Sequence, residues 1–431
     1  MTQRILRGRV LTFVQEPQSR DDHTSYRYFE DGAVVVSEGK VVWVGDFDTA
    51  DAVGAEFIDH RPHLILPGLI DAHLHYVQAQ VIGSYAAALL EWLNTYTFIE
   101  EQRFSQQGHA ARIAEKFFDE LIRHGTTTAA AYCSVHLQSA DAFFAEAARR
   151  NMRMIGGKVM MDRNGPEALL DTAQSGYDDS KALIERWHGR GRAHYAISPR
   201  FALTSTPQQL AASRALVEEF PDCYLQTHLS ENDDEIATAM RLYPEAKDYT
   251  GIYEQFGLLG RKSLMGHSIH LSHREAKAMA ETGAVAVFCP TSNLFLGSGL
   301  FDRERLINTG VRIGVATDIG GGTSYSMLRT MDEAYKVLQL RKQRLTPLNS
   351  FFMMTLGNAR ALSLEDRIGS IAPGRDADLV VLDARATPAM ALRMQTVETL
   401  AEELFVLQTL GDDRSVKEVY VAGQAAKSRL S

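Results

Sequence analysis

Cysteines and long apolar runs are both scarce in this chain. The 431 residues include only three cysteines, which are Cys133, Cys223 and Cys289. An odd number of widely spaced cysteines argues against a disulfide framework and is typical of free thiols in a reducing compartment. No stretch reaches the ~18 apolar residues of a membrane span, and Arg4, Arg7 and Arg9 interrupt the N-terminal apolar residues where a signal peptide needs a continuous run. We therefore expect a soluble cytoplasmic protein that does not associate with membranes.

Blocks of like charge are missing as well. The 45 lysines and arginines and 54 acidic residues give a net charge of -9, and both signs are interspersed along the chain. Nucleic acids and anionic membranes bind through concentrated positive charge, so neither is an expected partner. The composition is otherwise that of an ordinary globular protein, with 45% hydrophobic and 23% charged residues.

Short β-branched or apolar runs alternate with helical patterns from about residue 64 to 320. Eight runs are visible: 64–76, 126–134, 153–162, 194–201, 223–231, 263–271, 284–293 and 312–320. Helix starts lie between them, with capping boxes at Thr206–Gln209 and Ser272–Glu275. Eight strands alternating with helices predict an α/β fold of the TIM-like (β/α)8 barrel type, whose chemistry lies at the carboxyl ends of the strands.

The two ends of the chain read as β structure outside the barrel. Residues Gly32–Gly45 form two β-rich runs joined by a Gly39-Lys40 turn, which resembles a hairpin. Further strands are expected at Asp378–Asp383 and Val416–Val421, with one packed helix between Met390 and Leu407. We therefore expect a composite β-sandwich domain from residues 1–66 plus 367–431, and a barrel from residues 67–366.

Candidate metal ligands lie at the ends of three predicted strands. His73 and His75 form an H-x-H pair, and alternate side chains of a strand face the same way, so both imidazoles point to one place. His228 ends the fifth run and supplies a third imidazole, a set that suits zinc or iron. Asp318 closes the eighth run, which neighbours the first in a closed barrel. Such a site lowers the pKa of a bound water from 15.7 toward about 7, which indicates hydrolysis.

Two further residues are expected to move protons. Glu231 follows His228 by three residues and can stand beside the ion without binding it, where a carboxyl group can carry protons to a ring nitrogen and a leaving amine. His267 ends the sixth run and is placed to contact the substrate or the attacking water. Taken singly, each of these residues has an ordinary structural alternative, such as a core histidine, a capping aspartate or a surface glutamate.

Two absences narrow the chemistry. A second metal ion in such a barrel commonly needs a bridging lysine at the end of strand four, and the run His194–Phe201 contains no lysine, so one ion is expected. The other zinc-deaminase architecture needs a C-x-x-C motif, which occurs nowhere in the chain.

These residues resemble the metal signature of the amidohydrolase superfamily, in its single-metal deaminase and chlorohydrolase branch. Within it the chain most resembles the guanine deaminases. The matching segments are Pro67–His75, Gln78, Val81–Ser84, Leu89–Phe98, Ser198–Phe201, His228 with Glu231, His267, Cys289–Asn293 and Thr317-Asp318. The resemblance implies conversion of guanine to xanthine and ammonia, with one zinc per chain and iron as an alternative, held by His73, His75, His228 and Asp318.

For a purine base as substrate, the expected contacts are Gln78, Trp92, Arg200, Phe201 and His267. Arg200 offers donors to a carbonyl, Gln78 can donate and accept along a ring edge, and Phe201 or Trp92 can form an apolar wall. The alternatives are that Arg200 is a surface ion-pair partner and Trp92 only part of the core.

Two other functions stay open at this stage. One is a deaminase or dechlorinase of a related ring, such as an s-triazine or an oxidised purine, and the other is a non-catalytic scaffold on the same fold. We also expect a homodimer, although no residue pattern indicates the oligomeric state.

Overall fold

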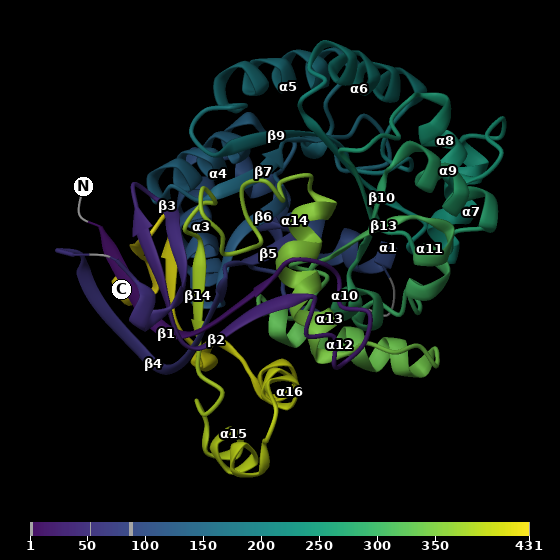
Figure 1. Ribbon diagram of the computed structural model, residues 1–431. Coiled ribbons are helices and arrows are strands. Elements are labelled where there is room, and N and C mark those ends of the chain that lie inside the picture. Colours follow the sequence, from purple (N-terminus) through teal and green to yellow (C-terminus); the bar gives the residue numbers. More distant parts are fainter. Residues whose placement is uncertain (1–2, 52, 86–88, 431) are drawn as a thin grey trace.

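The computed structural model describes residues 3–51, 53–85 and 89–430 (Figure 1). Residues 1, 2, 52 and 431 of the expected outer domain, and 86–88 of the expected barrel, lie outside the described residues. Strands in the described part form two sheets, a barrel of parallel strands and a seven-stranded sheet built from both chain ends. The predicted α/β barrel with a small β domain from both chain ends is therefore confirmed, although the described strands of that domain form one continuous sheet and not the two packed sheets of a sandwich.

The barrel strands follow one another around the sheet in sequence order, and all their pairings are parallel. They are β5 (Leu69–His75), β6 (Thr126–Tyr132), β7 (Arg153–Gly157), β9 (Ala193–Pro199), β10 (Tyr224–Leu229), β11 (Ser263–His267), β12 (Val285–Phe288) and β13 (Arg312–Val315), with the short β8 (Val159–Met160) paired to β9. Seven of the eight predicted runs contain their barrel strand in full, and the run 194–201 contains all of β9 except its first residue, Ala193. The strands are buried almost throughout, as expected for a parallel sheet covered by helices.

Helices surround the barrel (Figure 1). They are α3 (Gln107–Arg123), α4 (Leu137–Arg150), α5 (Ala173–Trp187), α6 (Pro207–Glu219), α7 (Asp233–Leu242), α8 (Tyr249–Gln255), α9 (His273–Thr282), α10 (Pro290–Phe295), α11 (Arg303–Thr309), α12 (Met327–Leu340), α13 (Pro347–Phe352) and α14 (Asn358–Ala361). The capping box of Ser272 and Glu275 is present. Thr206 caps α6, but the Gln209 side chain donates to Asp171 and does not complete a box.

Side chains complete the barrel between its first and last strands. Asn358 of α14 donates to the carbonyls of Ile70 in β5 (2.6 Å) and Val315 in β13 (2.8 Å), and it accepts from the Val315 N–H. At the other end of the strands, the Asp318 N–H donates to the His73 carbonyl at 2.9 Å. These bonds satisfy backbone groups that strand pairing leaves free, and they fix Asp318 beside β5.

The outer sheet has the order β16-β15-β14-β4-β1-β2-β3. Its strands are β1 (Arg4–Phe13), β2 (Tyr26–Ser37), β3 (Lys40–Asp46), β4 (Glu56–Pro67), β14 (Leu379–Leu382), β15 (Val416–Val421) and β16 (Gln424–Ala425). Because β4 ends at Pro67 and β14 begins at Leu379, we propose the division of the chain at residues 66 and 367. Both termini lie beside this sheet in Figure 1.

Two local predictions in the outer region were wrong. In the hairpin of β2 and β3, Ser37 pairs with Lys40, so the turn residues are Glu38 and Gly39, both with positive φ, which suits a two-residue hairpin loop. The apolar residues between 390 and 407 form two helices, α15 (Pro388–Arg393) and α16 (Leu400–Leu410), because Thr399 caps a second helix start.

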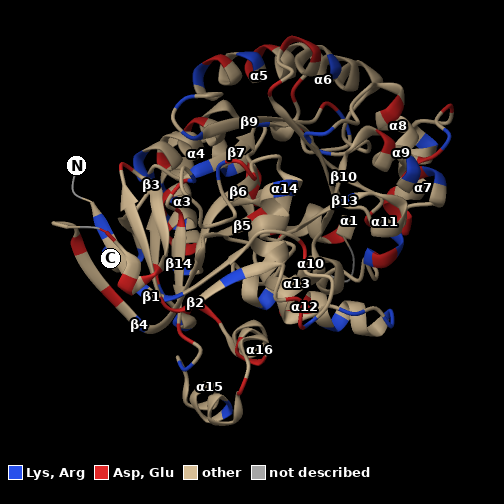
Figure 2. Cartoon of the chain, in the orientation of Figure 1, with Lys and Arg blue, Asp and Glu red and all other residues tan. Residues whose placement is uncertain are grey.

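No helix in the described ranges is long and apolar enough to cross a membrane. Figure 2 shows basic and acidic positions interspersed along the outer helices. That distribution agrees with the expectation that nucleic acid is not a partner, which stays a prediction.

Candidate metal centre and substrate pocket

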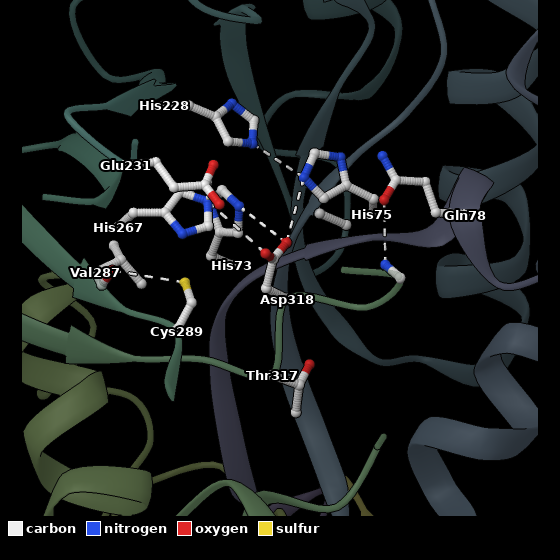
Figure 3. Close-up of polar contacts among 12 residues, drawn as sticks. His73, His75, Gln78, His228, Glu231, His267, Val287, Cys289, Thr317 and Asp318 are labelled. Atoms are coloured by element: carbon white, nitrogen blue, oxygen red, sulfur yellow. Dashed lines mark hydrogen bonds and ion pairs between the residues drawn. The ribbon is translucent and has the colours of Figure 1, made fainter. Parts of the chain in front are cut away.

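Three imidazoles and one carboxylate meet at the carboxyl ends of the barrel strands (Figure 3). His73 and His75 come from β5, His228 from β10, and Asp318 follows β13. The ligand nitrogens of the three histidines lie within 4.8 Å of one another, and Nε2 of His75 is 3.1 Å from Nε2 of His228. Asp318 Oδ1 lies 3.4 Å from Nε2 of His73 and 3.5 Å from Nε2 of His75. The sequence-predicted ligand set is thus brought together in space.

The donor atoms of this cluster fit a divalent cation. His228 Nδ1 donates to the Arg200 carbonyl at 2.7 Å, which leaves its Nε2 as a free lone pair facing His75. His73 Nε2 and His75 Nδ1 are buried and make no hydrogen bond with the residues described. Burial lowers the pKa of all three imidazoles, well below the usual value for His75 and His228, so they stay neutral. Neutral imidazoles with one carboxylate form a set that suits zinc or iron.

Neighbouring residues hold the ligands in place. Gly266 packs against His73, and a Cβ at this position would lie 2.7 Å from the imidazole Cε1. The Tyr132 ring stacks on His75, with centroids 4.6 Å apart. Below the cluster, buried Asp71 accepts from the hydroxyl and the N–H of Thr317, which precedes Asp318. The ligand side chains therefore have little freedom to move.

Glu231 and His267 lie beside the cluster as a second pair of ionisable groups. Glu231 Oε2 is 3.3 Å from Nε2 of His267, and Asp318 Oδ2 is 3.7 Å from the same nitrogen. Burial raises the pKa of Glu231 to about 7, although His267 opposes the shift. Burial lowers the pKa of His267, but Glu231 and Asp318 outweigh it and raise that pKa overall. Burial raises the pKa of Asp318, yet the contacts of its carboxylate with His73 lower that pKa overall to about 2.

Glu231 therefore exchanges protons near neutral pH while Asp318 stays ionised. Each of the two proton-transfer candidates is oriented by a neighbouring side chain: Ser298 donates to Glu231 Oε1 at 2.9 Å, and Asn293 Oδ1 lies 2.9 Å from His267 Nδ1. A donor at Nδ1 leaves Nε2 of His267 facing the two carboxylates.

One pocket opens on these groups. Its lining contains every residue predicted for the substrate, together with most of the metal and proton-transfer candidates: His75, Gln78, Leu89, Trp92, Leu93, Arg200, Phe201, His228, Glu231, His267, Leu296, Asp318 and Gly321. His73 lies behind this lining. Apolar side chains with a few convergent polar groups are typical of small-molecule sites.

The structure excludes a surface position for Arg200 and shows that Trp92 is both a core residue and a pocket residue. Trp92 belongs to the hydrophobic core and also faces the pocket, and its Nε1 has no partner among the described residues. Arg200 is buried, not at the surface, and pairs with Glu101 at 2.9 Å.

Sequence reasoning missed several residues at this site. In the sequence Asn293 stands out only as part of the segment Cys289–Asn293 and Cys289 only there and as a free cysteine, while no pattern singles out Glu101 or Ser298. Cys289 belongs with His73, His267 and Asp318 to a second group of ligand atoms within 4.8 Å, although burial raises the pKa of its thiol. The only sequence signal for Glu101 is its place three residues beyond the segment Leu89–Phe98, in the helix α2 (Phe98–Gln102).

Comparison with known proteins places this site in a family. Residues 64–426 match the model of the amidohydrolase family. The chain belongs to the amidohydrolase family. The resemblance seen in the sequence is confirmed.

Several proteins similar to this chain over nearly its whole length are guanine deaminases. Guanine deaminase of Escherichia coli strain K12 is 47% identical over 409 residues, which cover 94% of this chain and 93% of the relative. The solved structure of E. coli guanine deaminase matches with a TM-score of 0.95 and 45% identity, covering 98% of this chain and 99% of that one. Guanine deaminase from C. acetobutylicum, with guanine bound in its active site, matches with a TM-score of 0.89 and 28% identity over 98% and 100% of the two chains.

Proposed function

We infer that this chain catalyses the hydrolytic deamination of guanine to xanthine and ammonia. The observation that carries the inference is the 47% identity to a guanine deaminase over 94% of the chain. The pocket supports it, because the residues expected for a purine and all those expected for a metal-assisted hydrolase except His73 line one cavity.

We propose that His73, His75, His228 and Asp318 hold one metal ion, with zinc as the ion and iron as the alternative. The three neutral nitrogens and one ionised oxygen, all buried, are the donors that support this assignment. When bound, such an ion acts as a Lewis acid that lowers the pKa of water.

We propose separate roles in proton transfer for Asp318, Glu231 and His267. Asp318, whose pKa is about 2, is ionised and can accept a proton from the attacking water. Glu231, with a pKa of about 7, can be protonated at neutral pH and deliver a proton to N3 of guanine while water adds to C2. Glu231 then assists departure of the amino group as ammonia. His267 orients the water through Nε2, which faces both carboxylates.

We propose that the pocket walls recognise the ring. Arg200 donates to the O6 carbonyl, and Gln78 contacts a ring edge that carries both donors and acceptors. Phe201 and Trp92 pack against the ring faces or edges. All four line the pocket.

Metal loading should stabilise the fold. Adding Zn²⁺ to chelator-treated protein, at a free concentration of about 100 times its Kd, is expected to raise the melting temperature by several degrees, since such a ligand that binds only folded protein adds about 2.7 kcal/mol. Differential scanning calorimetry with and without the ion measures the shift. If the melting temperature does not change in protein that metal analysis shows to bind the ion, the ion does not bind at this folded cluster.

Arg200→Ala is expected to lower kcat/KM for guanine by ~10²–10⁴-fold while metal stays bound. In adenine an amino group replaces the carbonyl, and a guanidinium can only donate, so the wild-type protein leaves both groups unsatisfied. The poor rate with adenine should therefore hardly change. If guanine kcat/KM survives the substitution, Arg200 does not recognise the substrate.

A related ring as the true substrate is the alternative. Steady-state rates with guanine, adenine, cytosine and ammeline separate the two possibilities, because guanine should exceed the others by at least about tenfold in kcat/KM. A non-catalytic scaffold would show no turnover with any of them. The homodimer and the cytoplasmic location stay predictions.

A further inference from the structure

Glu101 lies directly behind the pocket wall and contacts two of its residues. Its carboxylate accepts from Nη1 of Arg200 with both oxygens, at 3.0 and 2.9 Å, and from Nε2 of Gln78 at 3.0 Å. The Glu101 side chain is 1% exposed, and that of Arg200 3%. Glu101 is not part of the pocket lining, so it can influence a bound ring only through these partners.

The contacts of Glu101 fix how both partners face the pocket. Gln78 donates to Glu101 through Nε2, and its Oε1 accepts from the Gly320 N–H at 3.2 Å, so its amide has one orientation. Nη1 of Arg200 is held by Glu101, and the Phe98 ring lies 5.3 Å from the guanidinium carbon. The other guanidinium nitrogens have no hydrogen-bond partner among the described side chains and backbone groups, and they are the donors that Arg200 can offer to a ligand.

Glu101 also balances a buried charge. Arg200 is permanently cationic, and an uncompensated cation inside a protein attracts anions strongly because little water screens it. With the Glu101 carboxylate as its ion-pair partner at 2.9 Å, Arg200 presents hydrogen-bond donors without a net positive charge. A neutral carbonyl can accept hydrogen bonds from these donors as it would from an unpaired arginine. An anionic ring, in contrast, loses the charge attraction that an unpaired arginine would provide.

We propose that Glu101 is a positioning residue that makes the pocket select neutral oxopurines over anionic ones, by neutralising and orienting Arg200 and Gln78. The proposal rests on the function inferred above. Xanthine is a stronger acid than guanine, because its second carbonyl delocalises the charge left when a ring N–H ionises. The arrangement would therefore favour the neutral substrate over the ionised product and limit product inhibition.

Competitive inhibition of the metal-loaded enzyme tests the proposal. Hypoxanthine, which has the 6-carbonyl but no 2-amino group, and xanthine are compared as inhibitors at a mildly alkaline pH, where xanthine is mostly anionic and hypoxanthine mostly neutral. Glu101→Gln should strengthen inhibition by xanthine about tenfold relative to inhibition by hypoxanthine. It should also raise KM for guanine more than it lowers kcat. Glu101→Asp keeps the charge and should keep the wild-type ratio.

Glu100 provides a matched control in the same helix. Its buried carboxylate pairs with Arg103 at 2.7 Å and with His109 at 3.0 Å, and it forms no hydrogen bond with Arg200 or Gln78. Glu100→Gln removes the same charge and should leave the inhibition ratio and guanine KM within about twofold of wild type. If it changes the ratio as much as Glu101→Gln, charge anywhere in α2 matters and the proposal is overturned.

Arg200→Gln should change the ratio of the two inhibition constants in the opposite direction. It also tests the proposal if the Glu101→Gln protein does not fold. Leaving Glu101 as an unpaired anion should shift the ratio away from xanthine, and the double variant Glu101→Gln/Arg200→Gln should return it toward wild type. An unchanged ratio in Glu101→Gln, or between Arg200→Gln and the double variant, overturns the proposal. Failure of the inferred function would show separately, because the wild-type enzyme would then not turn over guanine.

Discussion

Replacing His228 with alanine is expected to abolish metal binding and activity together. His228 is one of three imidazoles in the cluster, and its Nε2 is directed at the site because Nδ1 donates to the Arg200 carbonyl. Alanine removes a ligand, and two imidazoles with one carboxylate cannot hold the ion at the affinity of the full set. Metal analysis should find well under one ion per chain, and guanine kcat/KM should fall by more than about 10³-fold.

His273→Ala is the control for this substitution. His273 is exposed and begins α9, away from the cluster. Its removal should leave metal content and turnover at wild-type values. The assignment of His228 as a ligand fails if the His228→Ala protein retains one tightly bound ion.

Glu231→Gln should retain the metal but lower kcat by ~10²-fold or more. Glutamine has the same shape and can still accept from Ser298, so the pocket should stay intact. The amide cannot deliver a proton to the ring nitrogen at neutral pH, which removes the general acid. The measurement is kcat at saturating guanine on protein with a verified metal content.

Glu235 provides a useful contrast to Glu231. It is also buried, but Tyr249 donates to Oε1, and the N–H groups of Glu231 and Asn232 donate to Oε2. Because these bonds occupy both oxygens, Glu235 is not free to act as the shuttle. A wild-type kcat in the Glu231→Gln protein would instead assign the proton transfer to His267, the other ionisable group beside Asp318.

The barrel and its candidate ligands were predictable because they depend on local periodicity. Alternate residues of a strand face one side, and parallel strands of a barrel end together, so His73, His75, His228 and Asp318 could be expected to meet from their positions in the runs alone. The substrate side of the pocket needed the resemblance to guanine deaminases, since nothing in periodicity distinguishes one ring from another.

The supporting residues could not be predicted, because their roles come from contacts between distant parts of the chain. Asn358 bridges β5 and β13 across 288 and 43 residues of sequence, and Glu101 meets Arg200 across 99. Gly266 leaves room for the His73 imidazole, a role that no local sequence pattern indicates. The single helix predicted between Met390 and Leu407 was wrong because one residue, Thr399, caps the start of a second helix.

The measurement that tests the central claim most directly is the reaction of the purified, metal-loaded protein with guanine. We predict conversion of guanine to xanthine, followed by absorbance, with one ammonia released per xanthine formed, and loss of both signals after the metal is removed. Folded protein with a full complement of metal that leaves guanine unchanged would contradict the account.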